Sequence, residues 1–270
     1  MTPDIHIRKA ATPADYLACQ NAQRQSWGLA DESYVVPIAT MIGAQEHGGL
    51  VLGAFLPDGQ AVGLSFAFLG RAERRIVLYS QLTGIIPSYQ GQGLGQRLKT
   101  AQRDFARAEE IPYIAWAFDP LQAGNAYFNL AKLGATSSRF IPDMYGPRTD
   151  ALNRNAATDR LIALWETETP APKQRIAQDL PRLVLDIETN PVFAAIPAGA
   201  TDLRIDIPSE INKLRLEASD KAERWAQAVR EAFLAAFGAG YRAIGFEKSE
   251  FGASENCFYR LQSRDGSPHP

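Results

Sequence analysis

The order of hydrophobic and polar positions along the chain predicts an alternation of strands and helices. Short apolar or alternating runs predict strands at residues 5–7, 50–56, 61–69, 76–86, 113–118, 136–141 and 160–165. Apolar residues at helical spacing predict helices from residue 13 and over 36–46, 94–108 and 121–133. The turn Pro57-Asp58-Gly59 joins two of the strands into a hairpin. We therefore expect a mixed α/β domain.

A proline-containing segment, residues 167–173, separates this part of the chain from a second one. Here strands are predicted near residues 183–187, 203–207, 242–247 and 257–261, with a long helix over 221–237. Asp220 and Glu223 have the spacing of a capping box for that helix, and Gly238 ends it. We predict a domain over 1–168, a smaller α/β domain over 174–262 and a frayed tail over 263–270.

Composition and charge narrow the class of protein. The chain has 270 residues, 46% hydrophobic and 21% charged, as expected of a folded globular protein. Its 28 basic and 30 acidic residues leave a net charge of −2, which gives no electrostatic reason to bind nucleic acid. Cys19 and Cys257 stand far apart beside only three histidines, so we expect neither disulfides nor a metal site. Without an apolar leader or a bilayer-length apolar run, we expect a cytoplasmic protein with no membrane partner.

A glycine-rich turn between the strand over 76–86 and the helix from Leu94 is the segment with the clearest chemistry. A dinucleotide-binding motif would need a glycine at the position of Gln96, and a P-loop would need one at Leu98, before Lys99. Both motifs are disfavoured. Glycines there still allow successive backbone N–H groups to approach a pyrophosphate, and the helix N-terminus adds the positive end of its dipole.

Gln90, Gly93 and Gly95 form the pattern Q-x-x-G-x-G, and in this strand–turn–helix setting the sequence resembles motif A of the GNAT acetyltransferase superfamily. The resemblance covers about residues 5–165, and the helix over 121–133 resembles motif B of that superfamily. It implies a mixed, splayed central sheet flanked by helices. It also implies that acetyl-CoA or another acyl-CoA binds as co-substrate.

The resemblance assigns the parts of the CoA molecule to particular residues. The pantetheine arm is expected along Gly84, Ile85 and Ile86, and Gly84 suits a bulge at a strand end. The pyrophosphate is expected at Gly91, Gln92, Gly93, Leu94, Gly95 and Gln96, next to Gln90. Asn125, on the helix that resembles motif B, is a further candidate contact, with simple solvent exposure as the alternative.

The residues for acid and base catalysis depart from the family pattern. Leu130 stands where motif B usually has a tyrosine, and the strand over 76–86 has no carboxylate that could serve as a base. Three other residues are candidates. Tyr127 is otherwise a packing aromatic, Asp119 is otherwise the N-cap of the next helix, and Tyr145 is otherwise a turn residue.

These observations predict an acyl-CoA-dependent N-acyltransferase. It would transfer an acetyl or succinyl group directly, without a covalent enzyme intermediate, to the amine of a small molecule such as an amino acid. The alternative is a non-catalytic acyl-CoA-binding or scaffold module derived from a GNAT domain. The second part has the element order of a degenerate GNAT-like half but lacks a glycine motif before its helix. It would pack against the first domain, supply part of the acceptor pocket or form a homodimer interface.

Overall fold

The computed structural model describes residues 4–29, 31–72, 74–146, 157–168, 180–187, 190–248 and 256–263. These residues form two compact units. The first comprises the described residues of 1–116 and 166–168, and the second comprises those of 117–146, 157–165 and 180–263. The predicted boundary at residues 167–173 lies mostly outside the described residues, and the domain limits at 168 and 174 stay a prediction. Ser263 ends a strand, and the rest of the predicted tail lies outside the described residues.

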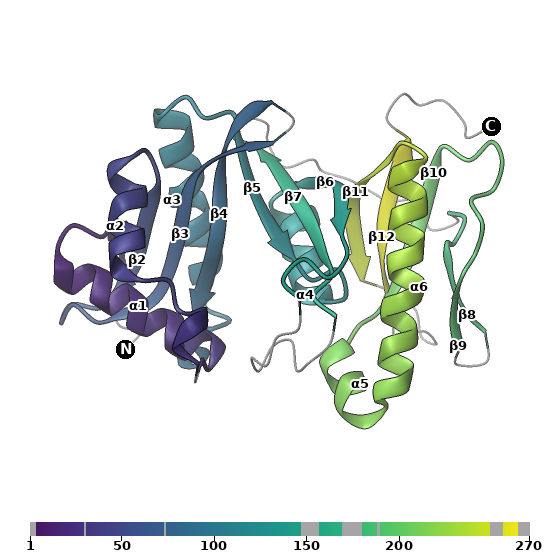
Figure 1. Cartoon of the computed structure of the whole chain (residues 1–270), viewed down its shortest axis with the longest axis horizontal. Helices are drawn as coiled ribbons and strands as arrows, with labels where there is room; N and C mark the ends of the chain where they lie inside the picture. The colour runs from purple at the N-terminus through teal and green to yellow at the C-terminus, as the bar shows by residue number, and fades with distance from the viewer. Residues whose placement is uncertain are drawn as a thin grey trace. The chain divides into compact units, whose positions relative to one another are not determined.

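The first unit contains a sheet with the strand order β1-β2-β3-β4-β5 (Figure 1). Its elements are β1 (His6–Lys9), α1 (Pro13–Trp27), η1 (Glu32–Tyr34), α2 (Ile38–Glu46), β2 (Leu50–Phe55), β3 (Ala61–Ala72), β4 (Arg75–Ile85), η2 (Pro87–Tyr89), α3 (Leu94–Ala108) and the start of β5 (Tyr113–Phe118). Neighbouring strands are antiparallel except β4 and β5, which are parallel. The mixed sheet flanked by helices confirms the predicted fold class.

Local sequence explains where α1 begins and ends. The Thr12 hydroxyl accepts a hydrogen bond from the Asp15 N–H, and the Asp15 carboxylate accepts one from the Thr12 N–H, which is a complete capping box. The Arg8 guanidinium contacts both Asp15 carboxylate oxygens, at 2.7 and 2.9 Å, and holds the pKa of that carboxyl well below its usual range. Gly28, at φ +59°, ends the helix in the left-handed conformation.

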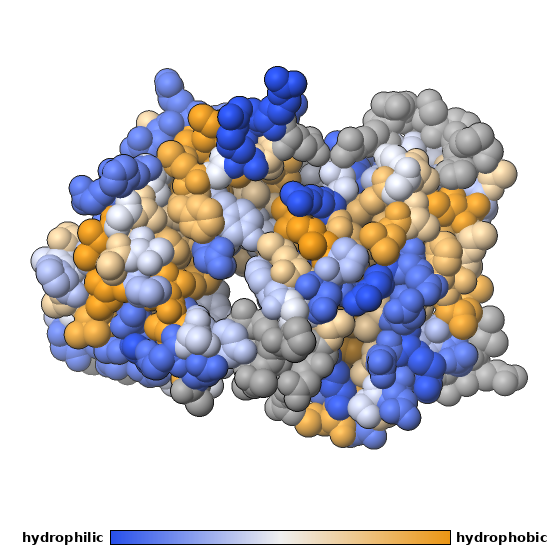
Figure 2. Space-filling model, in the orientation of Figure 1, coloured by the Kyte–Doolittle hydropathy of each residue, from blue (hydrophilic) through white to orange (hydrophobic). Residues whose placement is uncertain are grey.

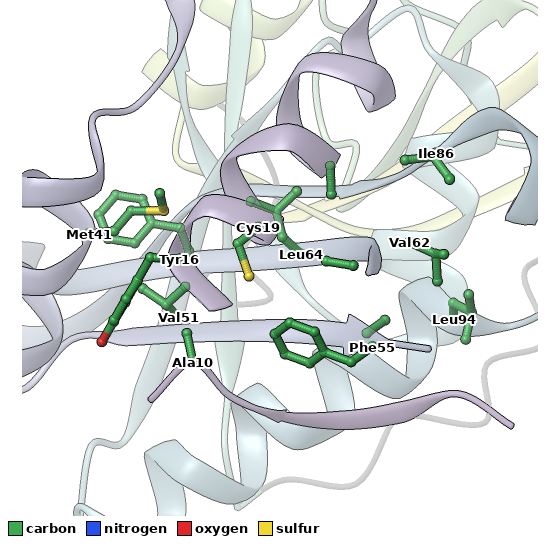
Figure 3. Close-up of a cluster of buried hydrophobic side chains, with 14 of the residues drawn as sticks. Ala10, Tyr16, Cys19, Met41, Val51, Phe55, Val62, Leu64, Ile86 and Leu94 are labelled. Atoms are coloured by element: carbon green, nitrogen blue, oxygen red, sulfur yellow. The ribbon is translucent and has the colours of Figure 1, made fainter. Parts of the chain in front are cut away.

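The core of the first unit lies between the helices and the strands β2 and β3 (Figure 3). Buried side chains point into it from α1, α2, β2, β3, the residue that follows β4 and the start of α3: Tyr16, Cys19, Met41, Val51, Phe55, Val62, Leu64, Ile86 and Leu94. Cys19 is completely buried, which raises the pKa of its thiol to about 12 and leaves it an inert core residue. Burial of this apolar surface is the main source of stability of the unit.

The second unit contains a sheet segment with the strand order β7-β6-β11-β12-β10, and a separate hairpin of β8 and β9. Its elements are the end of β5, α4 (Ala123–Ala126), η3 (Tyr127–Lys132), β6 (Thr136–Ile141), most of β7 (Arg160–Glu166), β8 (Val184–Ile187), β9 (Asn190–Phe193), β10 (Asp202–Pro208), α5 (Ile211–Glu217), α6 (Ser219–Gly238), β11 (Tyr241–Lys248) and β12 (Asn256–Ser263). Helix α6 packs on this sheet, where Phe233 stacks on Phe140 and meets Tyr259 edge to face.

The structure corrects several element predictions in the second unit. Strand β9 and helix α5 were not predicted. Helix α6 begins at Ser219 behind Ala218 without a side-chain cap, so the predicted capping box of Asp220 and Glu223 is wrong. The helix predicted over 121–133 begins at Ala123 and widens into a π-helix from Tyr127. Among the described residues, no helix is long and apolar enough to cross a bilayer.

Hydrophilic side chains gather over the tip of the β3–β4 hairpin (Figure 2), where Arg71, Arg74 and Arg75 are exposed. The opposite end of β4 is different in character. It leads through residues 87–96, which contain no charged side chain, into α3. An anion at that end of the strand would therefore depend on backbone N–H groups and not on basic side chains.

Candidate functional site

The turn before α3 has the conformation that its glycines were expected to permit. Gly91 and Gly93 have φ values of +75° and +76°, in the left-handed region that favours glycine. The first backbone bond of α3 runs from the Arg97 N–H to the Gly93 carbonyl at 3.1 Å. The N–H groups of Leu94, Gly95 and Gln96 precede that bond, so they point out of the helix at the positive end of its dipole.

Both ends of this turn are fixed in the core of the first unit. Ile86 and Leu94 are only 5% and 2% exposed, and both belong with Val62 to the buried cluster drawn in Figure 3. The Ile86 N–H donates to the Val62 carbonyl at 3.1 Å, and the Gln90 side-chain amide donates to the Ile85 carbonyl at 3.0 Å. The conformation of the turn is therefore set before any ligand binds.

The outer side of the turn is open. Gly91, Gln92 and Gly93 are exposed, and a Cβ atom built on Gly91, Gly93 or Gly95 would meet no atom within 4 Å. The side chains that are missing at these positions would therefore project into free space in front of the N–H groups. A pyrophosphate fits such a site, because it needs close approach to consecutive N–H groups and no competing side chain.

Strand β4 leads into this turn and changes partners along its length. It pairs with β3 from Arg75 to Ile85, whereas its parallel register with β5 comprises Leu78–Ile114 and Tyr79–Ala115. The register with β3 shifts at Gln81, which is the extra residue of a bulge. The bulge follows the pairs with β5 directly, as expected of strands that separate to admit a ligand between them.

Gly84 is a glycine for a reason that the sequence did not indicate. A Cβ atom at this position would lie 2.4 Å from Cη2 of Trp27 and 2.9 Å from Cβ of Ser26, both on α1. The indole of Trp27 therefore packs directly on the backbone of β4. The expected bulge at Gly84 is wrong, because the bulge lies at Gln81.

A buried polar cluster lies beneath β4, and its central residue is a lysine of α3. Lys99 is 4% exposed; its Nζ lies 2.9 Å from Ser80 Oγ and 3.0 Å from Gln102 Oε1. The same Nζ lies 4.1 Å from the centroid of the Trp116 ring. Burial lowers the pKa of Lys99 from 10.5 to about 7. An amine with a pKa in this range exchanges protons near neutral pH.

This cluster was missed because the predicted apolar stripe of α3 covers only part of the face that the helix buries. Helical spacing indicated Leu94, Leu98, Ala101, Phe105 and Ala108, but Ala108 is exposed. The buried residues of the helix are Leu94, Leu98, Lys99, Gln102 and Ala106. The sequence does contain one sign of this, since Gln102 and Ala106 continue the four-residue spacing that Leu94 and Leu98 begin.

Asp119, a candidate catalytic residue, has both carboxylate oxygens occupied in the second unit. Oδ1 accepts a hydrogen bond from the Leu121 N–H at 2.8 Å, and Oδ2 lies 3.2 Å from an Arg215 guanidinium nitrogen. The expected N-cap role is wrong, because α4 begins later, with Gln122 at its N-cap. Asp119 instead closes the turn that precedes α4. Its role as a base stays a prediction.

The region that resembles motif B holds three of the residues that were singled out. Leu130 is 2% exposed and part of the core, so the family's usual acid position is apolar here. Tyr127 is half-buried, with Lys132 Nζ 5.8 Å from its ring centroid, and Asn125 is exposed on α4. The catalytic role of Tyr127 and the CoA contact of Asn125 stay predictions.

The loop after β6, which carries the candidate Tyr145, is held by polar contacts within the second unit. The Tyr145 N–H donates to Thr158 Oγ1 at 2.9 Å, and Asp143 Oδ1 accepts from the Thr158 N–H at 3.0 Å. Asp159 accepts from the Asp143 N–H at 2.9 Å and pairs with the Arg230 guanidinium of α6 at 2.6 and 2.9 Å. This pairing raises the pKa of Arg230. The loop is therefore preorganised by α6.

Cys19 and Cys257 are both buried, and neither takes part in a disulfide. Over the described ranges, no group of three or more His, Cys, Asp or Glu side chains lies together as a metal ion would require. The features that stand out are therefore the turn at Gly91–Gly93 with β4, and the polar cluster around Lys99.

No family model and no curated protein matches the chain. Several solved structures, however, are similar to the chain. A candidate acetyltransferase from Acinetobacter baylyi is 17% identical, with a TM-score of 0.50 over 64% of this chain and 99% of its own. One from Salmonella typhimurium, solved with acetyl-CoA, is 19% identical, with a TM-score of 0.48 over 64% and 99%. A GNAT-family acetyltransferase from Streptococcus pneumoniae is 16% identical, with a TM-score of 0.48 over 60% and 99%. The chain has a GNAT-type fold, and at these identities the likeness shows the fold alone.

Proposed function

We propose that the protein is an acyl-CoA-dependent N-acyltransferase. The observation that carries this proposal is the turn after β4, where glycines at positive φ leave the N–H groups of Leu94, Gly95 and Gln96 open at the start of α3. A pyrophosphate is the ligand chemistry that such a turn fits. The adjoining strand, bulged at Gln81, offers backbone groups for the amides of a pantetheine arm.

The proposed reaction is direct transfer of an acetyl or succinyl group to the amine of a small molecule, such as an amino acid. The amine nitrogen attacks the thioester carbonyl, the bond between carbon and sulfur breaks, and CoA leaves as the thiol. The acceptor ammonium loses one proton before attack. Since no carboxylate of β4 can take it, the proton passes to another group or to water. A motif-B tyrosine is absent, so dipoles of the site stabilise the leaving thiolate.

The first test is binding, measured by calorimetry with CoA and acetyl-CoA on the full chain. Gly93→Val is expected to weaken CoA binding at least tenfold, about 1.4 kcal/mol, because a β-branched residue is strained at this φ and would occupy the phosphate space. Gly59→Val is the matched control. Gly59 has φ +88° and an equally open surrounding, but it belongs to the β2–β3 hairpin and not to the turn before α3. Equal affinities of the two folded variants for CoA would contradict the assignment.

The second test is turnover with acetyl-CoA or succinyl-CoA and a panel of amino acids and small amines, with free thiol as the readout. Thiol release that depends on the amine supports the transferase. Binding of CoA without thiol release on any amine of the panel would favour the alternative, an acyl-CoA-binding module. Failure to bind CoA would overturn both.

A further inference from the structure

The Lys99 cluster forms a closed ring of hydrogen-bonding side chains. Beyond its contacts with Ser80 and Gln102, the Gln102 side-chain amide donates to Ser65 Oγ at 3.1 Å. Ser65 Oγ lies 3.0 Å from Thr83 Oγ1, which lies 3.5 Å from Ser80 Oγ and closes the ring. The ring therefore links α3 with β3 and β4 inside the first unit. Lys99 is its only ionisable member.

The position of the ring connects it with the proposed CoA site. Ser80 and Thr83 stand on either side of the bulge at Gln81, and Gly84 follows Thr83 directly. The other side of the ring is α3, whose N-terminus forms the glycine turn. A change inside the ring therefore acts on the same strand and the same helix that the proposed function assigns to acyl-CoA.

No acidic side chain faces the Lys99 amine from the elements around it. Helix α3 packs on β1, β2, β3 and β4, and none of these strands, nor β5, contains Asp, Glu or His apart from the exposed His6. The charged or titratable residues on these elements are Arg8, Lys9, Arg71, Arg75, Tyr79, Arg97, Arg103, Asp104, Arg107 and Tyr113, of which Asp104 is exposed. Desolvation is accordingly the cause of the lowered pKa of Lys99.

The two protonation states of Lys99 impose different hydrogen-bond directions on the ring. An ammonium can only donate, so Ser80 Oγ and Gln102 Oε1 both accept from it. The Ser80 and Ser65 hydroxyls then both donate hydrogen bonds to Thr83 Oγ1. The Thr83 hydroxyl accepts these two bonds and donates its own hydrogen to a group outside the ring. A neutral amine can instead accept the Ser80 hydrogen. Thr83 can then donate its hydrogen to Ser80 Oγ. In that state the Thr83 hydroxyl no longer donates a hydrogen bond outside the ring.

We propose that Lys99 is a positioning residue of the acyl-CoA site, which sets through Ser80 whether the Thr83 hydroxyl donates a hydrogen bond to a ligand lying along β4. The inference rests on the proposed function, because the ligand is acyl-CoA. Thr83 is half-buried, so its hydroxyl lies between the buried ring and the surface. The ammonium form of Lys99 is the form that favours ligand binding.

The experiment measures the affinity of the full chain for acetyl-CoA by calorimetry over a range of pH, for wild type and Lys99→Met. Methionine has nearly the same length and no amine. The CoA phosphate monoester titrates near pH 6, so the measured quantity is the ratio of wild-type to variant affinity at each pH. We expect wild type to bind about tenfold more tightly below pH 7, with the ratio falling toward one above it. A ratio that does not change with pH would overturn the inference.

Two further variants keep the test decisive if Lys99→Met does not fold. Thr83→Val removes the responding hydroxyl and is expected to show the same loss of about tenfold in acetyl-CoA affinity below pH 7 and the same fall of the wild-type to variant ratio toward one above it. Thr100→Val, on the exposed side of α3, is the matched control and should keep the wild-type profile. A wild-type profile in Thr83→Val would overturn the inference while leaving the proposed function intact. Failure of wild type to bind acetyl-CoA at any pH would instead overturn the proposed function.

Discussion

Substitution of Lys99 should change how the stability of the protein depends on pH. Burial lowers the pKa of this amine from 10.5 to about 7 in the folded chain, whereas the unfolded chain keeps the ordinary value. Between these two pH values the unfolded state holds the extra proton, so the free energy of unfolding rises with pH. The slope is about 1.4 kcal/mol per pH unit, and the whole interval amounts to about 5 kcal/mol. Below pH 7 both states hold the proton and this dependence disappears.

The measurement is urea unfolding of wild type and Lys99→Met, followed by tryptophan fluorescence between about pH 6 and pH 10. Other groups titrate in the same range, so the quantity to compare is the difference in free energy of unfolding between the two proteins at each pH. The variant leaves Ser80 and Gln102 with fewer partners, which costs about 1–3 kcal/mol at every pH. The pH dependence of the difference is therefore diagnostic, and its absolute value is not.

Lys213→Met is the matched control, because Lys213 is exposed on α5. Its stability curve should run parallel to that of wild type. The free energy of unfolding of wild type should rise relative to that of Lys99→Met as the pH increases above 7, because only wild type gains stability there. Parallel curves for wild type and Lys99→Met would refute the reasoning, since they would show that the buried amine titrates alike in both states.

Two more substitutions follow from packing and pairing. Gly84→Ala should lower the free energy of unfolding by about 1–3 kcal/mol, because the added Cβ would collide with Trp27. Gly70→Ala, whose Cβ would meet its nearest neighbours at 3.7 and 3.8 Å, should change it far less, and similar losses in the two variants would disprove the close contact. Arg230→Met should cost about 2 kcal/mol in thermal unfolding and loosen the Tyr145 loop, because it leaves the Asp159 carboxylate buried without its partner. An unchanged melting temperature would argue against that account.

Most of the fold could be predicted from the sequence because its strands are short apolar runs separated by turn residues. The hairpin at Pro57-Asp58-Gly59 is an example: Gly59 has φ +88°, as the turn requires, and β2 and β3 pair across it. The glycine turn before α3 was predictable for the same reason. Gly91 and Gly93 adopt a conformation that other residues avoid, so their identity carries the backbone geometry.

The features that sequence reasoning missed depend on contacts between distant segments. Gly84 is explained by Trp27, which lies on another element, and nothing near Gly84 in the sequence indicates that contact. Nothing in the sequence marks Lys99 as buried, because lysines are rarely buried without an acidic partner. Its burial depends on hydroxyl and amide groups from β3, β4 and α3, which only the tertiary fold brings together.

The segment that resembles motif B is held by residues from much later in the chain. Within the second unit, Tyr259 of β12 donates a hydrogen bond to the Pro120 carbonyl at 2.7 Å, and Arg215 of α5 pairs with Asp119. Strand β6 is also paired with β11, through Ser137 and its partner. A chain ending at residue 168 would lose all of these contacts and leave a polar edge of β6 unpaired. The later residues are thus part of the scaffold that shapes this segment.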